Sequence, residues 1–186
     1  MSARTVVTAS LVTLAVVPAL SAQQKGQVTK SKDTLIREAM AAAPKEIAMN
    51  ATIMSAGADG KLVQLRPGTN GWTCLPDAPD TPGQDAMCAD KQAMMWVGSW
   101  LKHEAKPANT EPGVMYMLTG GSDISATDPW AKPGPGTKWV ESPPHYMIIW
   151  PFKPGTSGLS ATPKKTGTWI MWAGTPYAHL MINQKP

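Results

Sequence analysis

The stretch GTNGWTCLPDAPDTPGQDAMC, residues 68–88, constrains the fold more than any other part of the chain, because it holds both cysteines and three prolines. Proline fixes φ and lacks an amide donor, so neither a helix nor a central strand can run through Pro76, Pro79 and Pro82. The aspartates and glycines between them are typical of turns. The sequence therefore predicts an irregular but rigid loop.

We expect Cys74 and Cys88 to form a disulfide, the simplest use of two cysteines in an exported chain. Closing a loop of this size stabilises a fold by about 3 kcal/mol in the chain-entropy model. The loop also offers carboxylates that could bind calcium. They are Asp77, Asp80, Asp85 and Asp90. Their spacing is not that of an EF-hand, and aspartates that cap turns explain the same pattern.

Residues 1–22 have the features of a secretory signal peptide. Arg4 supplies the positive start, an apolar run follows, and small residues precede a predicted cleavage point after Ala22. The apolar run is short for a membrane span, so we expect no stable membrane anchor after signal removal. The prediction is a periplasmic or secreted protein with a flexible tail over 23–32 and a single domain over 33–186.

Composition narrows the class of protein further. The formal net charge is only +4 and is spread along the chain, which disfavours nucleic acid as a partner. Proline (18) and glycine (16) are frequent, which predicts many turns and short elements. With 12 methionines, 8 tryptophans and a single phenylalanine, the core has to be built from thioether, indole and aliphatic side chains.

Apolar periodicity predicts two helices, at 33–43 and 90–104. The predicted strands are 46–54, 61–66, 113–118, 145–150, 168–172 and 177–182. Residues 119–123 are expected to form a tight turn, and 128–138 an irregular loop. Together these elements predict an α+β fold, mainly antiparallel sheet, with one or two helices and a disulfide-stapled loop.

Five segments together resemble an uncharacterised family of secreted bacterial proteins. They are GTNGWTC, DAMC, YMLTGGSD, HYMI and GTPYAHLMI, and the resemblance spans residues 44–182. Family members carry Asp-Pro-Met-Cys at 85–88, where this chain has Ala86, and Gly-Pro-His where it has Pro143-Pro144-His145. The resemblance implies one exported domain and implies no function.

Two His-x-Met pairs predict a metal site made of His145, Met147, His179 and Met181. In a strand, positions i and i+2 point to the same face, so each pair presents an imidazole beside a thioether. If the two strands are neighbours, the four side chains converge. Imidazole suits copper and thioether selects Cu(I), so copper is the predicted cofactor. Ordinary core methionines and carbonyl-bonded histidines explain the same residues.

The His145-to-His179 spacing and the closing His179-x-Met181 are similar to a family of small periplasmic copper chaperones. That signature has methionines where this chain has Tyr146 and Ser157. The resemblance implies copper binding and no further property.

The leading prediction is a soluble exported protein that binds a small ligand or a metal ion without catalysis. One alternative is a small secreted hydrolase in which His145 or His179 acts with Asp123 or Asp128; Ser122 lies in no nucleophile elbow. Another is a carbohydrate-binding module that uses tryptophans near loops and strand ends. These are Trp72, Trp130, Trp139, Trp150, Trp169 and Trp172.

Overall fold

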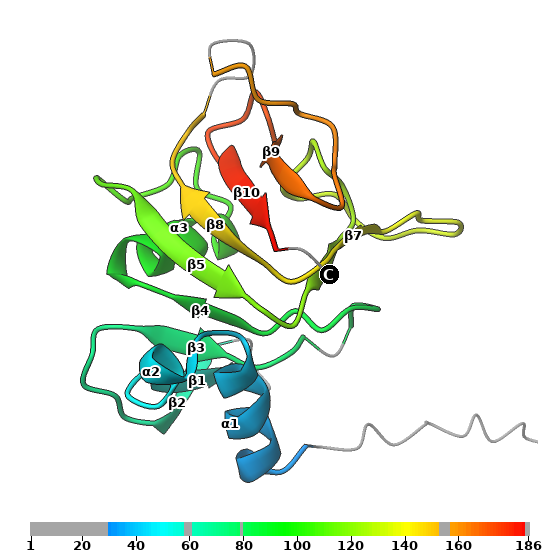
Figure 1. Ribbon diagram of the computed structural model, residues 1–186. Helices are drawn as coiled ribbons and strands as arrows, with labels where there is room; N and C mark the ends of the chain where they lie inside the picture. The colour runs from blue at the N-terminus through cyan, green and yellow to red at the C-terminus, as the bar shows by residue number, and fades with distance from the viewer. Residues whose placement is uncertain (1–29, 58–60, 79, 153–156, 185–186) are drawn as a thin grey trace, which may run out of the picture.

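The structure is a computed structural model that describes residues 30–57, 61–78, 80–152 and 157–184. The predicted signal peptide and most of the predicted tail lie outside these ranges. The core of the fold is an eight-stranded sheet with the order β2-β1-β3-β4-β5-β8-β10-β9 (Figure 1). Its strands are β1 (Thr52–Ala56), β2 (Leu62–Arg66), β3 (Thr73–Leu75), β4 (Met87–Ala89), β5 (Gly113–Met117), β8 (His145–Ile149), β9 (Gly167–Met171) and β10 (His179–Asn183).

The sheet is mixed: β1 and β3 pair in parallel, and all other neighbouring strands of the sheet pair antiparallel. The described helices are α1 (Lys32–Ala41), α2 (Lys45–Ala48) and α3 (Lys91–Leu101). An α+β fold dominated by antiparallel pairing is therefore confirmed, with one more helix than predicted. Among the described helices, none has the length and apolarity to cross a membrane.

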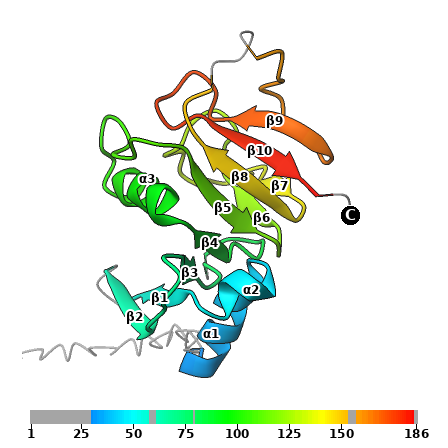
Figure 2. The ribbon, with the colours of Figure 1, turned by 60° about the vertical axis from the view of Figure 1, so that its left-hand side comes forward.

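The two longer helices cover opposite faces of the sheet. Cys88 faces Tyr116 in the β4–β5 register and packs with Ala39 of α1. The next pair, Ala89 and Met115, points to the other face and packs with α3. Figure 2 shows α1 beside the β1–β3 end and α3 beside β5. The β5–β8–β10 part of the sheet thus has one face enclosed under α3.

Asp90 ties α3 to the sheet. Its Oδ1 accepts a hydrogen bond from the Ala93 amide at 2.8 Å, which caps the helix, and its Oδ2 accepts one from the Val114 amide, also at 2.8 Å. A Cβ on Gly113 would lie 2.9 Å from the Ala93 Cα, so glycine lets β5 pass beneath the start of α3. The predicted helix at 90–104 is thus present, but it ends at Leu101.

The disulfide between Cys74 and Cys88 is confirmed. The two residues face each other across β3 and β4, with Cα atoms 4.0 Å apart. Inside the loop, Asp77 Oδ1 accepts a hydrogen bond from the Asp85 amide at 2.8 Å, as a turn-capping carboxylate does. The described residues contain no group of three or more His, Cys, Asp or Glu side chains that could hold a metal ion. The calcium alternative gains no support.

Two predicted local elements are wrong. Residues 45–48 form α2 after Pro44, so the first strand begins only at Thr52. The predicted turn at 119–123 contains β6 (Gly121–Asp123), which pairs with β7 (Val140–Ser142) in a separate two-stranded sheet. Gly120, at φ 90°, makes the reversal, and a partner some 20 residues away supplies pairing that no local pattern reveals.

Candidate functional site

A cavity of about 770 Å³ lies against the α3 face of the sheet. This volume falls in the range of small-molecule pockets. Most of its wall is apolar, and six methionines, three tryptophans and two histidines contribute to it. They are Met87, Met115, Met117, Met147, Met171, Met181, Trp96, Trp100, Trp172, His145 and His179.

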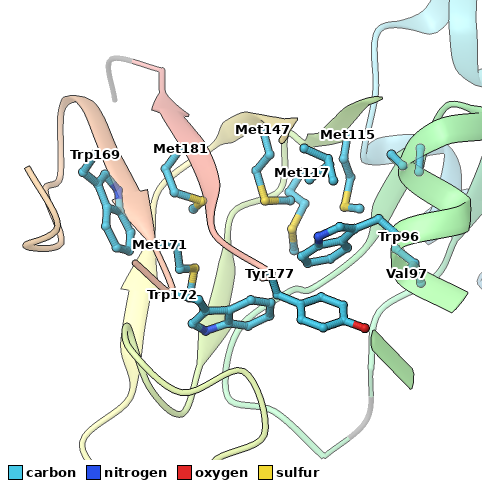
Figure 3. Packing of buried hydrophobic residues seen from close by; sticks show 13 residues of the cluster. Trp96, Val97, Met115, Met117, Met147, Trp169, Met171, Trp172, Tyr177 and Met181 are labelled. Atoms are coloured by element: carbon cyan, nitrogen blue, oxygen red, sulfur yellow. The ribbon is translucent and has the colours of Figure 1, made fainter. Parts of the chain in front are cut away.

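Three of these methionines form a row across adjacent strands. Met115 faces Met147 in the β5–β8 register, and Met147 faces Met181 in the β8–β10 register. We call Met115, Met147 and Met181 the methionine row. Figure 3 shows their sulfur atoms, with those of Met117 and Met171, turned toward the side where the Trp96, Trp172 and Tyr177 rings lie. The row gives the cavity a soft, polarizable floor.

The two predicted histidines lie on opposite sides of the methionine row, one on β8 and one on β10. His145 faces Met117 on β5 and Asn183 on β10, whereas His179 faces Met171 on β9. Asn183, the β10 partner of His145, is four residues beyond His179. The backbone positions of the two histidines are therefore about 13 Å apart along the strand direction. The structure therefore brings Met147 and Met181 together, and it pairs each histidine with a different cross-strand methionine.

Both imidazoles are held in the same tautomer. Nδ1 lies 2.7 Å from the Pro143 carbonyl oxygen in His145, and 3.0 Å from the Tyr177 carbonyl oxygen in His179. Because a carbonyl can only accept, each Nδ1 carries the proton and each Nε2 keeps a lone pair. Neither Nε2 has a hydrogen-bond partner in the described part of the chain.

Burial keeps both histidines neutral. Each is only 2% exposed. Desolvation lowers the pKa of His145, and it lowers the pKa of His179 to about 4. At neutral pH the two side chains thus offer the cavity two uncharged nitrogen acceptors.

The His179 end of the cavity is aromatic. The His179 ring meets Trp96 and Trp172 edge-on, with centroids 5.3 Å and 5.1 Å away, and the two indoles are stacked at 5.7 Å. Trp172 has a φ of 52°, which is rare for a bulky residue. Its indole nitrogen donates to the Ser125 carbonyl at 2.9 Å, and its amide donates to Ala126 at 2.8 Å. These bonds hold the strained conformation at the cavity wall.

The other end, which we call the acidic end, consists of Asp85, Asp123 and His145. A Cβ built on Gly121 would lie 3.1 Å from Asp85 Oδ1 and 3.6 Å from His145 Cε1, so both side chains flank this glycine. Burial, the largest cause, and the charge of Asp85 raise the pKa of Asp123 to about 6. A polar cluster thus lies at one end of a mostly apolar cavity.

The geometry of the site does not favour the predicted alternative of a hydrolase. Both histidines bond carbonyl oxygens, and neither bonds a carboxylate. Asp123 and Asp128 accept from nearby backbone amides, those of Ser125 and Trp130. The acid–base pair that a hydrolase needs is therefore not formed among the described residues.

The positions of the tryptophans also give little support to a carbohydrate-binding module. Of the six tryptophans predicted to contact sugars, Trp169 and Trp172 are buried in the core, and Trp150 is the most open at 37% exposed. The buried pair cannot stack on a sugar at the surface.

Sequence reasoning missed several site residues. Met115 and Met117 could have been found, because they alternate with Val114 and Tyr116 in a strand that was predicted, and so share the opposite face. The sequence offers Asp85 only as a calcium ligand, because its place in the cavity depends on a hydrogen bond from Ser122, 37 positions away, which no local pattern reveals.

No protein-family model, curated protein or solved structure matches this chain. The resemblance to secreted bacterial proteins therefore stays a prediction, and the site geometry is what indicates function.

Proposed function

We propose that this protein is an exported, non-enzymatic binding protein that takes up a small, largely apolar molecule in the methionine-lined cavity. The observation that carries the proposal is a cavity of about 770 Å³ with thioether and indole walls and two unpartnered imidazole acceptors. Ligand pockets have this pattern of apolar walls with a few convergent polar groups. The disulfide fits an oxidising compartment.

The polar groups of the cavity support binding over catalysis. Ser122 Oγ lies 3.2 Å from Asp85 Oδ2 and 3.0 Å from the Gly83 amide, so its hydroxyl donates to a carboxylate and has no contact with an imidazole. A serine nucleophile needs an adjacent base that accepts its proton during attack. The neutral histidines are better suited to orient a ligand than to move protons.

The test is uptake of a fluorescent apolar probe such as 1-N-phenylnaphthylamine by the purified protein. We expect saturable binding with one probe per chain. Met147→Trp fills the cavity and should abolish binding, whereas Met95→Trp, at a site that is 36% exposed on α3, should not. Circular dichroism checks that both variants fold. If Met147→Trp does not fold, Val97→Phe serves as the cavity-filling variant in its place. Absence of saturable binding to the unmodified protein would refute the proposal.

Cu(I) binding is a second candidate function, favoured by one observation. Each His-x-Met pair gains a third soft ligand from a neighbouring strand: Met117 faces His145, and Met171 faces His179. The Nδ1–H of each histidine is held by a carbonyl, as is usual for metal-binding histidines. Thioether and imidazole together suit Cu(I).

A Cu(I) titration against bicinchoninate separates the two possible arrangements. Two independent sets predict two equivalents, of which His145→Ala removes one and His179→Ala the other. The single four-ligand site predicted from sequence would bind one equivalent, lost in either variant. No competition with the chelator would exclude copper and leave the apolar ligand as the function.

A further inference from the structure

We propose that the ligand of this cavity is an amphipathic amine, with its protonated nitrogen at the acidic end and its apolar body lying across the methionine row. The inference rests on the proposed function, because it names the chemical class of the molecule that the cavity takes up.

The carboxylate of Asp85 is fixed in place at the acidic end. Its Oδ1 accepts from the Ser122 amide at 2.5 Å, and its Oδ2 accepts from Ser122 Oγ at 3.2 Å and from the Thr81 hydroxyl. The Asp85 residue is only 8% exposed. Three donors on one buried carboxylate make a rigid, preorganised negative group.

The acidic end has no counter-charge of its own. Both ion pairs found among the described residues belong to Lys30, which contacts Glu38 and Asp77. Lys30 is also the single lysine or arginine that lines the cavity in the described ranges. Asp85 and Asp123 therefore form no ion pair among the described residues, and a buried negative charge without a partner cation is costly.

The unpartnered nitrogen of His145 points to the same class of ligand independently. His145 is 2% exposed and lines the cavity, and its Nδ1–H is used by Pro143, so Nε2 can only accept. An ammonium group has up to three donors and no acceptor. Two carboxylates and an imidazole lone pair match it.

The same inventory disfavours an anionic head group. Ser122 Oγ is already bonded to Asp85 and to the Gly83 amide, so its hydroxyl is not free to donate to a ligand. A ligand carboxylate would meet like charges there, which is unfavourable.

Three probes with one tail test the inference: decylammonium, decanol and decanoate, each used to displace 1-N-phenylnaphthylamine. We expect decylammonium to bind about tenfold more tightly than decanol, because charge-assisted hydrogen bonds are roughly twice as strong as neutral ones. Decanoate should bind most weakly. Asp123→Asn should reduce the preference for decylammonium to about threefold or less and leave decanol unaffected. Asp80→Asn, at an exposed position outside the cavity lining, is the matched control.

Each outcome distinguishes the two proposals. If none of the probes displaces the dye and the dye itself does not bind, the proposed function fails together with this inference. If all three bind with similar affinity, or decanoate binds best, the cavity is an apolar pocket and the amine inference is wrong. A tenfold preference that persists unchanged in Asp123→Asn would also overturn it.

Discussion

Replacing Asp90 with alanine removes two hydrogen bonds that position the helix over the cavity. One is the cap to the Ala93 amide, and the other is the bond to the Val114 amide at the start of β5, both 2.8 Å long. Loss of an N-cap costs about 1 kcal/mol. A backbone N–H left without its partner costs about 1–3 kcal/mol more. We therefore expect Asp90→Ala to lower the free energy of unfolding by about 2–4 kcal/mol.

Asp90→Ser separates the two contributions. Serine still caps the helix, but its single short hydroxyl cannot also reach the Val114 amide. Asp90→Ser should therefore keep the helix cap and lose the bond to the Val114 amide. Its free energy of unfolding should lie between those of the wild type and Asp90→Ala. The assay is urea unfolding followed by tryptophan fluorescence, with an unchanged m-value as the sign that only stability has changed. For a domain of this size, Asp90→Ala should also lower Tm by about 10 °C.

The helix also carries Trp96 and Trp100 into the cavity wall, so probe affinity should fall in Asp90→Ala as well. A loss of stability below about 0.5 kcal/mol in Asp90→Ala, the level of ordinary surface substitutions, would refute the reasoning. Equal losses in the serine and alanine variants would show that the Val114 bond, and not the cap, carries the whole effect.

Three further predictions follow from other contacts. Replacing Cys74 and Cys88 together by serine should cost about 3 kcal/mol in thermal or urea unfolding, and an equal stability of the reduced and oxidised wild type would contradict this. Gly121→Ala should lower probe affinity and stability, the latter by about 1–3 kcal/mol, because the new Cβ would lie 2.9 Å from Met117 Cε and near Asp85. Burial raises the pKa of Asp123 to about 6 from 3.8, so the folded chain binds more protons than the unfolded chain between these values, and stability falls as pH rises through them. Asp123→Asn should therefore be more stable than wild type at pH 7.5 and equal to it near pH 4, and a constant difference across this range would be evidence against the raised pKa.

The sequence was sufficient to predict helices and strands where the local apolar pattern agrees with the burial seen in the fold. The stripe of Ala93, Val97 and Trp96 marked α3, and its cap at Asp90 was visible three residues before the first buried position. The alternation over 113–118 predicts β5 and the apolar run over 145–150 predicts β8, and in both strands every second residue is buried. The disulfide prediction followed from there being two cysteines in a chain expected to be exported, and the prolines between them predicted the irregular loop.

Local patterns failed where the partner is distant or the element is very short. The local pattern predicts a strand at the four-residue helix α2 after Pro44, because Ile47 and Ala48 suit either a helix or a strand. The local pattern predicts a turn at β6, because the pairing of β6 with Val140–Ser142 has no local signature. Both His-x-Met pairs lie on strands, as predicted, but the separation of the two histidines along the strand direction depends on the β8–β10 register, which a sequence alone does not supply.

The position of β10 has a consequence for how the chain folds. This strand comes last among those described, yet it lies between β8 and β9, and it carries His179 and Met181. Until it arrives, β8 and β9 each present an open hydrogen-bonding edge, the kind of surface that recruits other chains. During synthesis, therefore, the sheet stays split in two and the cavity stays without part of its floor until residue 183 has emerged. A pause or truncation before that point should yield a species that aggregates, even though every earlier element is intact.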